Sequence, residues 1–135
     1  MNDVVVDASA LVMALTMRTS EAYRLPRRLT HCRRHAPHLV DAEVGHALRR
    51  RVMGGWLSPE TALIALRRLP ETVQSRHPHA GPLSEAAWRM RATVTFYDAL
   101  YVALAASLDV PLLTCDARLS RAPGTRCRVE VAGLD

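Results

Sequence analysis

Four acidic side chains stand at positions where they could act together chemically. Three of them follow closely on short apolar runs that predict buried strands, and the fourth lies in the first turn of the most apolar predicted helix. The strand-end acids are Asp7, Glu43 and Asp116, and the helix acid is Asp98. Ligands of open α/β sheets bind outside the carboxyl ends of the strands. We therefore expect these four carboxylates to converge on one edge of a sheet.

The expected surroundings of the acids favour a bound metal ion. A step of about 100° per residue places Asp98 on the helix face that also carries Val102 and Ala105. A carboxylate directed toward such a face is costly unless it is paired or bound to a cation. The chain has no Lys to pair with it, because all 18 of its basic residues are Arg. An all-oxygen ligand set favours Mg²⁺ or Mn²⁺, so we expect one of these ions at the site.

Each acid also has a purely structural interpretation. Asp7 could be the N-cap of the helix that follows it, and Asp116 could be a turn residue. Asp98 could complete a capping box with Thr95. We expect Asp41 to be the N-cap of its helix and therefore not to be catalytic. These structural roles do not predict a shared location for the acids, and a common metal site does.

The elements that would position these acids alternate along the chain. Short strands are predicted at residues 4–6, 38–40, 72–75, 111–114 and 127–131. Helices are predicted from residue 8 to 15, around 23–29, over 44–52 with Gly54 as its stop, from Ser58 to before Pro70, from Ser84 through Met90, and over 96–108. Strands that alternate with helices predict an α/β fold in which helices flank both faces of a central parallel sheet.

Composition supports one folded domain with a nucleic-acid partner. The chain has 135 residues, of which 49% are hydrophobic and 23% charged, and we take residues 1–135 as a single domain. A net charge of +5 and a pI near 9.9 fit a phosphate-rich ligand, since the Arg fork matches phosphate geometry. Codon bias in a GC-rich genome is an alternative reason for the absence of Lys.

The first residues and the cysteines indicate a cytoplasmic protein. Asp3 and Asp7 occupy the place of the basic segment of an export signal. The longest uncharged stretches, 8–17 and 99–108, are too short to span a bilayer. The cysteines fit no zinc motif and are expected to be reduced thiols. They are Cys32, Cys115 and Cys127.

Four segments around the acids resemble the PIN-domain family, and more closely its VapC toxins. They are the segments 5–10, 37–44, 97–105 and 111–116, which carry Asp7, Glu43, Asp98 and Asp116 in the order and spacing of the family. The resemblance extends from about Val4 to Val131. It implies a Rossmann-like PIN domain with a central parallel sheet flanked by helices. It also implies that the four acids bind the metal and that two hydroxyl side chains, those of Ser9 and Thr114, support them.

The same resemblance implies what the chain does. A VapC-type toxin is a Mg²⁺-dependent (or Mn²⁺-dependent) endoribonuclease, forms a homodimer, and is inhibited by a small antitoxin that blocks its acidic site. A metal held by carboxylates lowers the pKa of its bound water and neutralises charge on the phosphate, and both effects are needed to hydrolyse a phosphodiester bond. Glu43 would be a further ligand or would orient the attacking water. The family suggests a structured loop of transfer or ribosomal RNA as substrate.

Three other interpretations were weighed against this one. A phosphatase with an aspartate nucleophile would need a second Asp two residues after Asp7, where Ser9 stands. A non-catalytic PIN domain would bind RNA or protein without cutting, but the presence of all four acids argues against it. A housekeeping PIN nuclease would process RNA and have no antitoxin. The small single-domain length favours the toxin over this last alternative.

Overall fold

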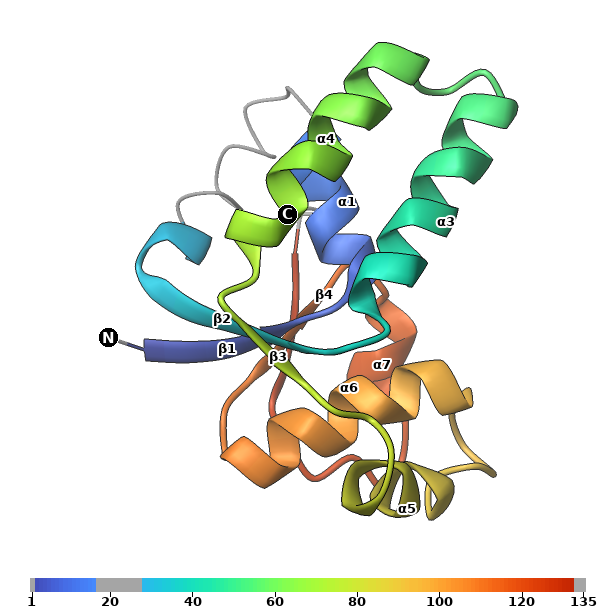
Figure 1. Cartoon of the computed structure of the whole chain (residues 1–135). Helices are drawn as coiled ribbons and strands as arrows, with labels where there is room; N and C mark the ends of the chain where they lie inside the picture. Colours follow the sequence, from blue (N-terminus) through green and yellow to red (C-terminus); the bar gives the residue numbers. More distant parts are fainter. Residues whose placement is uncertain (1, 17–27, 133–135) are drawn as a thin grey trace.

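The computed structural model describes residues 2–16 and 28–132 and contains a five-stranded sheet in the order β3-β2-β1-β4-β5 (Figure 1). All four strand pairs are parallel. The strands are β1 (Asn2–Val6), β2 (Cys32–Pro37), β3 (Ser75–His77), β4 (Leu112–Thr114) and β5 (Val129–Val131). The helices are α1 (Ala8–Thr16), α3 (Val40–Met53), α4 (Pro59–Thr72), α5 (Pro82–Trp88), α6 (Phe96–Leu108) and α7 (Ala117–Arg121). The predicted α/β architecture is confirmed.

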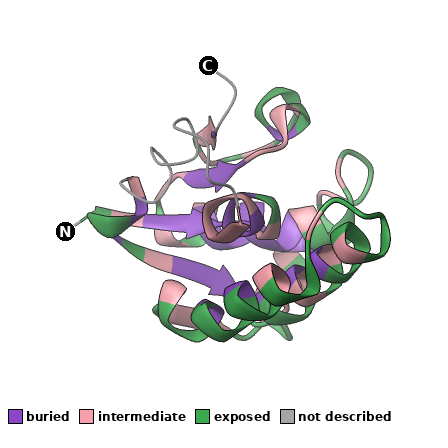
Figure 2. Ribbon diagram, turned by 90° about the horizontal axis from the view of Figure 1, so that it is seen from above, coloured by how far each residue is buried: buried purple, intermediate pink, exposed green. Residues whose placement is uncertain are grey.

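The helices form a layer on each side of the sheet, with the core between them. Figure 1 shows α1, α3 and α4 on one side of the sheet and α5 and α6 on the other. The central strand β1 ends in Val4, Val5 and Val6, which have no exposed surface. Residues 99–105 of α6 are all buried, and Figure 2 shows buried strands between helices whose outer faces are exposed. Because β1 and β4 are neighbours near the middle of the sheet, their carboxyl ends lie side by side.

The second strand lies earlier in the chain than residues 38–40, so that prediction is wrong. β2 covers Cys32–Pro37 and pairs with β1, whereas His38 and Leu39 form a turn and Val40 begins α3. Two adjacent Arg residues concealed the strand, because their charge interrupts the apolar pattern. Arg33 is exposed. Arg34 donates hydrogen bonds to main-chain carbonyls, including that of Thr72, and these bonds allow its charged side chain to lie in the sheet.

Several other boundaries differ from the predictions. β3 is Ser75–His77 rather than residues 72–75, because α4 continues to Thr72 through Pro70. Pro70 has no N–H to donate, so one carbonyl in the preceding turn of α4 lacks its helical hydrogen bond. Because Pro70 is exposed, water can bind that carbonyl instead. α5 begins at Pro82 and ends before Met90. The predictions did not include α7, and β5 is shorter than predicted.

Other local predictions are confirmed. Ser58 caps α4 by accepting a hydrogen bond from the Thr61 N–H, with Pro59 at the first helical position. Gly54 is the C-cap of α3, and α6 covers the predicted residues 96–108. The helix predicted around 23–29 falls mostly outside the described residues. Within the described part of the chain, no helix is both long and apolar enough to cross a membrane.

Candidate active site

Asp7 follows β1 directly and is almost completely buried. Its Oδ1 accepts hydrogen bonds from the Ala10 N–H at 3.0 Å and from Ser9 Oγ at 2.7 Å, and its Oδ2 accepts one from Thr114 Oγ1. The capping role considered for Asp7 is therefore present, since Ala10 lies in the first turn of α1. Burial raises the pKa of Asp7, three hydrogen bonds work against that rise, and the charge of Asp98 adds to it.

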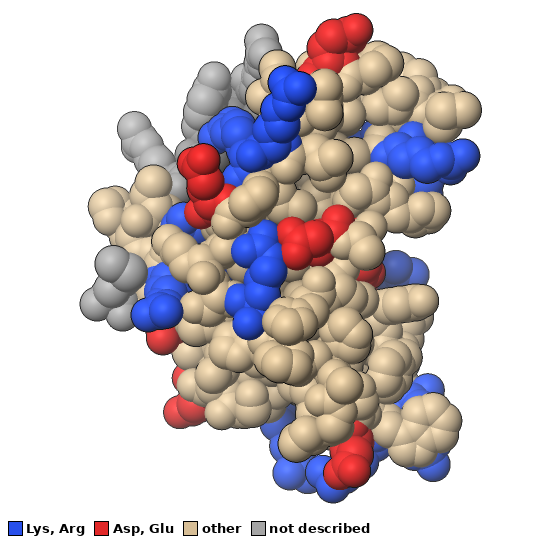
Figure 3. Space-filling view, viewed as in Figure 1, with Lys and Arg blue, Asp and Glu red and all other residues tan. Residues whose placement is uncertain are grey.

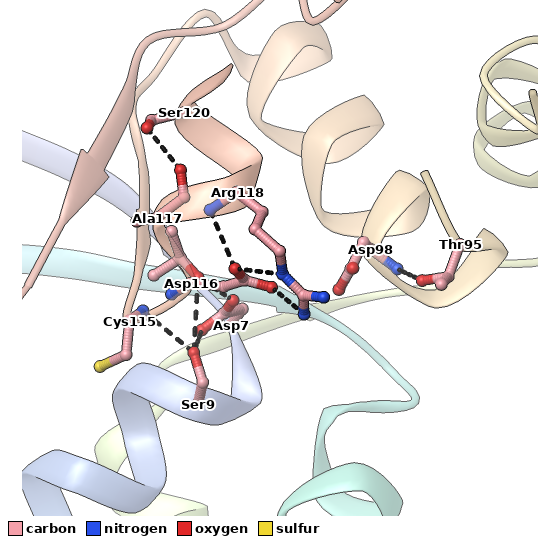
Figure 4. Close-up of polar contacts among 10 residues, drawn as sticks. Asp7, Ser9, Thr95, Asp98, Cys115, Asp116, Ala117, Arg118 and Ser120 are labelled. Carbon is pink, nitrogen blue, oxygen red and sulfur yellow. Dashed lines mark hydrogen bonds and ion pairs between the residues drawn. The ribbon is translucent and has the colours of Figure 1, made fainter. Parts of the chain in front are cut away.

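The two hydroxyl residues connect the ends of β1 and β4. Ser9 Oγ also accepts from the Cys115 N–H at 3.0 Å, and Thr114 Oγ1 accepts from the Asp116 N–H at 3.0 Å. Each hydroxyl therefore donates to Asp7 and accepts from a main-chain N–H of the segment that carries Asp116. Figure 4 shows the contacts of Ser9 with Asp7 and Cys115. Ser9 and Thr114 thus hold two of the four acids in a defined relation.

Asp116 lies just after β4 and is bound by an arginine from its own helix. Its side chain caps α7 by accepting from the Arg118 N–H. Arg118 Nε donates to Oδ1 at 3.0 Å, and Arg118 Nη2 donates to Oδ2 at 2.9 Å. Arg118 lowers the pKa of Asp116. The expectation that the acids lack a basic partner, which rested on the absence of Lys, is therefore wrong for Asp116, whose partner is an Arg two residues away.

Asp98 lies in the first turn of α6. The N-cap of this helix is Thr95, whose hydroxyl accepts from the Asp98 N–H at 3.1 Å. The half of the expected capping box in which Thr95 accepts from the Asp98 N–H is therefore present. Figure 4 shows the Asp98 carboxylate on the same side of the site as the Arg118 guanidinium. Burial raises the pKa of Asp98, the Thr95 bond opposes the rise, and Asp116 adds to it.

Glu43 reaches the site from α3 and not from a strand end. It lies in the first turn of that helix, because the turn after β2 leads directly into α3. Its Oε1 accepts a hydrogen bond from Tyr101 Oη at 2.7 Å. Burial raises the pKa of Glu43, and the charges of Asp98 and Asp7 raise it further. Tyr101 was not among the predicted site residues, although a hydroxyl three residues after Asp98 on an apolar helix could have indicated it.

Asp41 is not a helix cap, so that prediction is wrong. The N-cap position of α3 is Leu39, which makes no side-chain capping bond. Asp41 instead forms a two-point ion pair with Arg76 of β3, with Nε–Oδ2 at 2.7 Å and Nη2–Oδ1 at 2.8 Å. The residue is exposed on the first turn of α3, and its carboxylate is engaged by this pair.

The acidic site, defined here as Asp7, Glu43, Asp98 and Asp116, has the donor chemistry of a divalent-cation site. Its members come from four separate parts of the fold, and the charges of some raise the pKa of others. Partly buried carboxylates that repel one another are stabilised by a shared hard cation. As the side chains lie, no three His, Cys, Asp or Glu residues of the described chain are close enough to hold a metal. The four acids fit such an ion by side-chain type and by charge.

Comparison with known proteins identifies the family. The PIN domain family model matches residues 4–124. Ribonuclease VapC1 of Mycobacterium tuberculosis is 51% identical over 131 residues, which cover 97% of this chain and 98% of that protein. The structure of PAE2754 from Pyrobaculum aerophilum superposes with a TM-score of 0.69 at 26% identity, covering 96% of this chain and 84% of that one.

A more distant structure agrees in fold. The structure of VapBC2 from Rickettsia felis matches with a TM-score of 0.69 over 95% of this chain and 97% of that one. That structure was solved with VapBC2 bound to a DNA fragment from its promoter. Its sequence identity is 13%, so this likeness concerns the fold alone. The chain is matched over nearly its whole length by both the family model and the sequence relative. It belongs to the PIN-domain family and, within that family, to the VapC ribonucleases.

Proposed function

We propose that this VapC-type ribonuclease is the toxin of a VapBC-type pair and cleaves RNA with Mg²⁺ or Mn²⁺ bound at the acidic site. The observation that carries the proposal is the convergence of four carboxylates from β1, α3, α6 and β4 on one partly buried site. Such a convergence is unfavourable by itself and becomes favourable with a cation. The 51% identity to ribonuclease VapC1 supports the same conclusion.

The mechanism assigns each side chain a task. When bound, the metal would supply a nucleophilic water at neutral pH and neutralise phosphate charge. Ser9 and Thr114 fix the orientation of Asp7, whose two oxygens face different partners. Tyr101 fixes Glu43 through Oε1. The raised pKa of Glu43 suits an acceptor for the proton of the attacking water.

We also propose that a small antitoxin inhibits the enzyme by inserting a basic side chain among the acids. Exposed apolar side chains at the end of α3, on α4 and in the segment between them offer such a partner a place to pack. They belong to Met53, Trp56, Leu63, Ile64 and Leu66. Because the chain is basic, with a net charge of +5, the partner should carry acids around its inserted base.

A homodimer in the cytoplasm is the proposed working form. Exposed aromatic side chains at α5 and α6 support a second protein contact, namely those of Trp88, Phe96 and Tyr97. Trp88 and Phe96 also line a surface hollow of about 470 Å³. Light scattering on purified protein measures the mass directly, and a monomer at all concentrations would contradict this part of the proposal.

Cleavage is tested with purified protein and total RNA, with Mg²⁺ or with EDTA, by mapping the ends produced. We expect Mg²⁺-dependent cuts that disappear in Asp7→Asn and Asp98→Asn. The matched control is Asp109→Asn, which makes the same change at the other end of α6. Asp109 has a φ of 54°, a left-handed conformation that Asn also tolerates. Wild-type cleavage by Asp98→Asn at unchanged thermal stability would remove Asp98 from the metal site.

Toxicity is tested by expressing the chain alone and together with the short reading frame upstream of its gene. We expect growth arrest from the chain alone, and growth with co-purification when both are made. The comparison includes Asp98→Asn, which should be harmless alone and should still bind the partner. Normal growth with an active enzyme made alone would favour a housekeeping RNA-processing nuclease.

A further inference from the structure

We infer that Arg118 exchanges between Asp116 and an RNA phosphate, so that metal and RNA bind to this enzyme cooperatively. The inference rests on the proposed function and adds a regulatory residue to its site. Arg118 would act by leaving Asp116 when a cation takes that carboxylate, and by then binding the substrate backbone. It is therefore a positioning residue that couples two ligands.

Arg118 occupies both carboxylate oxygens of Asp116. Nε lies 3.0 Å from Oδ1, and Nη2 lies 2.9 Å from Oδ2, which is the two-point geometry of an Arg–carboxylate pair. A metal ion that uses Asp116 as a ligand competes with this guanidinium for the same oxygens. While the pair is formed, both oxygens of Asp116 are engaged by the guanidinium.

The pair can be exchanged easily. The Arg118 side chain is 85% exposed, and within the described chain its guanidinium bonds to Asp116 alone. Exposed ion pairs contribute little net stability, because water and salt screen them. A phosphate presents the same geometry to Arg as a carboxylate does and binds it with two parallel hydrogen bonds. A bound RNA backbone therefore offers Arg118 an equivalent partner.

The position of the side chain suits this exchange. Figure 4 shows the guanidinium between the carboxylates of Asp116 and Asp98. Its charge acts on Asp98 as well, in the direction that favours the ionised carboxylate. An RNA phosphate held beside these acids would be repelled by them, and Arg118 is placed to offset that repulsion.

Thermodynamic linkage then joins the two ligands. If a metal frees Arg118 for phosphate, then phosphate must free Asp116 for the metal by the same factor. The neighbouring Arg121 offers a control within the same helix, because it acts on Asp116 through its charge and donates no hydrogen bond to it.

The first test measures RNA binding in EDTA, where no cleavage occurs, by fluorescence anisotropy of a labelled single-stranded RNA. Four proteins form a cycle: the wild type, Asp116→Asn, Arg118→Ala and the double variant. We expect Asp116→Asn to tighten binding by about threefold or more when Arg118 is present, because the guanidinium is then free. The tightening should disappear in the Arg118→Ala background. Equal tightening in both backgrounds would mean that only a negative charge was removed, and would overturn the inference.

The second test measures Mn²⁺ binding without RNA by electron paramagnetic resonance. We expect Arg118→Ala to bind Mn²⁺ at least threefold more tightly than Arg121→Ala, which corrects for the loss of one positive charge. Arg118→Lys should lie between Arg118→Ala and the wild type. Equal Mn²⁺ affinity of the two alanine variants would contradict the exchange. Both readouts are independent of RNA cleavage, so an inactive wild-type protein would count against the proposed function and leave these results to decide the role of Arg118.

Discussion

Asp7 uses its two oxygens for two purposes. Oδ1 caps α1 and receives Ser9, while Oδ2 receives Thr114 from the neighbouring strand. The hydrogen bonds from Ala10, Ser9 and Thr114 help a carboxylate with 6% exposure to be tolerated in the folded chain. Burial nevertheless raises the pKa of Asp7, and the charge of Asp98 adds to the rise. A structural role and a place in the acidic site are therefore compatible in one residue, and the same holds for Asp116.

We predict that Asp7→Asn stabilises the protein in EDTA, increasingly so as pH rises. A group whose pKa is raised on folding contributes its full stability below its unfolded pKa, near 3.8 for Asp, and loses it as pH rises through the folded value. Asn does not titrate and keeps the Oδ1 acceptor for Ala10. The difference in Tm between Asp7→Asn and wild type should therefore increase between pH 4 and pH 8.

The control for this prediction is the same pair of proteins in Mg²⁺. Metal binding favours the ionised carboxylates, so Mg²⁺ should raise the Tm of the wild type and leave that of Asp7→Asn nearly unchanged. A Tm difference that is flat or decreases with pH in EDTA would show that burial does not raise the pKa of Asp7 in solution.

We predict that Tyr101→Phe lowers kcat/KM by about tenfold. The Tyr101 hydroxyl donates to Glu43 Oε1, and a hydrogen bond to a charged group is worth about 1.5–3 kcal/mol. This bond also lowers the pKa of Glu43, so the acid limb of the pH–rate profile should move to higher pH in the variant. Phe preserves the ring of this buried residue, and the fold should be retained.

The matched control for Tyr101→Phe is Tyr97→Phe. Tyr97 lies on the same helix, and its side chain is largely exposed. Steady-state kinetics at several pH values should separate the two variants. If Tyr101→Phe has the rate and the pH profile of the wild type, then Tyr101 does not position Glu43 for the reaction.

At the scale of elements, Arg76 connects three parts of the fold on the α3–α4 side of the sheet. It lies in β3, pairs with Asp41 in the first turn of α3, and donates to main-chain carbonyls at the end of α4, among them Val73 O at 2.8 Å and Leu69 O at 3.3 Å. α4 has no basic residue in its last turn, and Arg76 supplies this C-terminal interaction from a strand. The pair also joins β3 to the first turn of α3.

We predict that Arg76→Ala destabilises the protein more than Asp41→Asn does. Arg76→Ala removes both the ion pair and the bonds to α4, and should lower the free energy of unfolding by about 1–2 kcal/mol. Asp41→Asn removes only an exposed ion pair and should cost below about 1 kcal/mol. Urea denaturation measures both changes, and RNA cleavage should remain near the wild-type rate in both variants.

Two results would change this assignment. Equal destabilisation by the two variants would mean that the ion pair, rather than the bonds to α4, carries the effect of Arg76. A large loss of cleavage by Asp41→Asn at unchanged stability would place Asp41, rather than Glu43, in the reaction.

At the scale of the whole molecule, a basic chain surrounds an acidic site. The net charge is +5, and on the face seen in Figure 3 arginine side chains are spread over several elements rather than gathered in one patch. Such a distribution attracts a polyanion such as RNA. The acids repel the phosphates of its backbone unless a cation is bound between them. Arg51 of α3 is exposed. Its charge acts to lower the pKa of Cys115, the residue before Asp116, which indicates that Arg51 lies near the site.

We predict that RNA binding weakens steeply with salt and that Arg51→Gln lowers the slope of log K against log salt by about 0.7, the contribution of one single-strand phosphate contact. The control is Arg33→Gln. Arg33 lies near the start of β2, at the edge of the sheet opposite to the acids, and donates a hydrogen bond to Ser75. Binding is measured in EDTA at several salt concentrations. An equal slope for Arg51→Gln and Arg33→Gln would exclude Arg51 from the RNA path.

Local patterns in the sequence were sufficient to predict the α/β architecture, the bounds of α6 and the caps at Ser58 and Gly54. These features depend on hydrophobic periodicity and on the chemistry of single residues, both of which are local. The candidate acids could be selected for the same reason, since each follows a strand or begins a helix. The position of β2 could not be predicted, because Arg34 donates to the Thr72 carbonyl and Arg33 donates to the Ser75 hydroxyl, and both partners lie far away in sequence.

Tertiary structure alone decided which side chains meet. The sequence placed Asp41 and Glu43 two residues apart on one helix, and packing directs the first to Arg76 of β3 and the second to Tyr101 of α6. Ser9 and Thr114 share Asp7 because β1 and β4 are parallel neighbours, although 105 residues separate the two hydroxyls. Amino-acid types determined that this chain has the carboxylates of a candidate metal site. The order of strands in the sheet and the helices packed on it determined which of their oxygens face one another, because contacts between distant segments depend on packing and leave no local pattern.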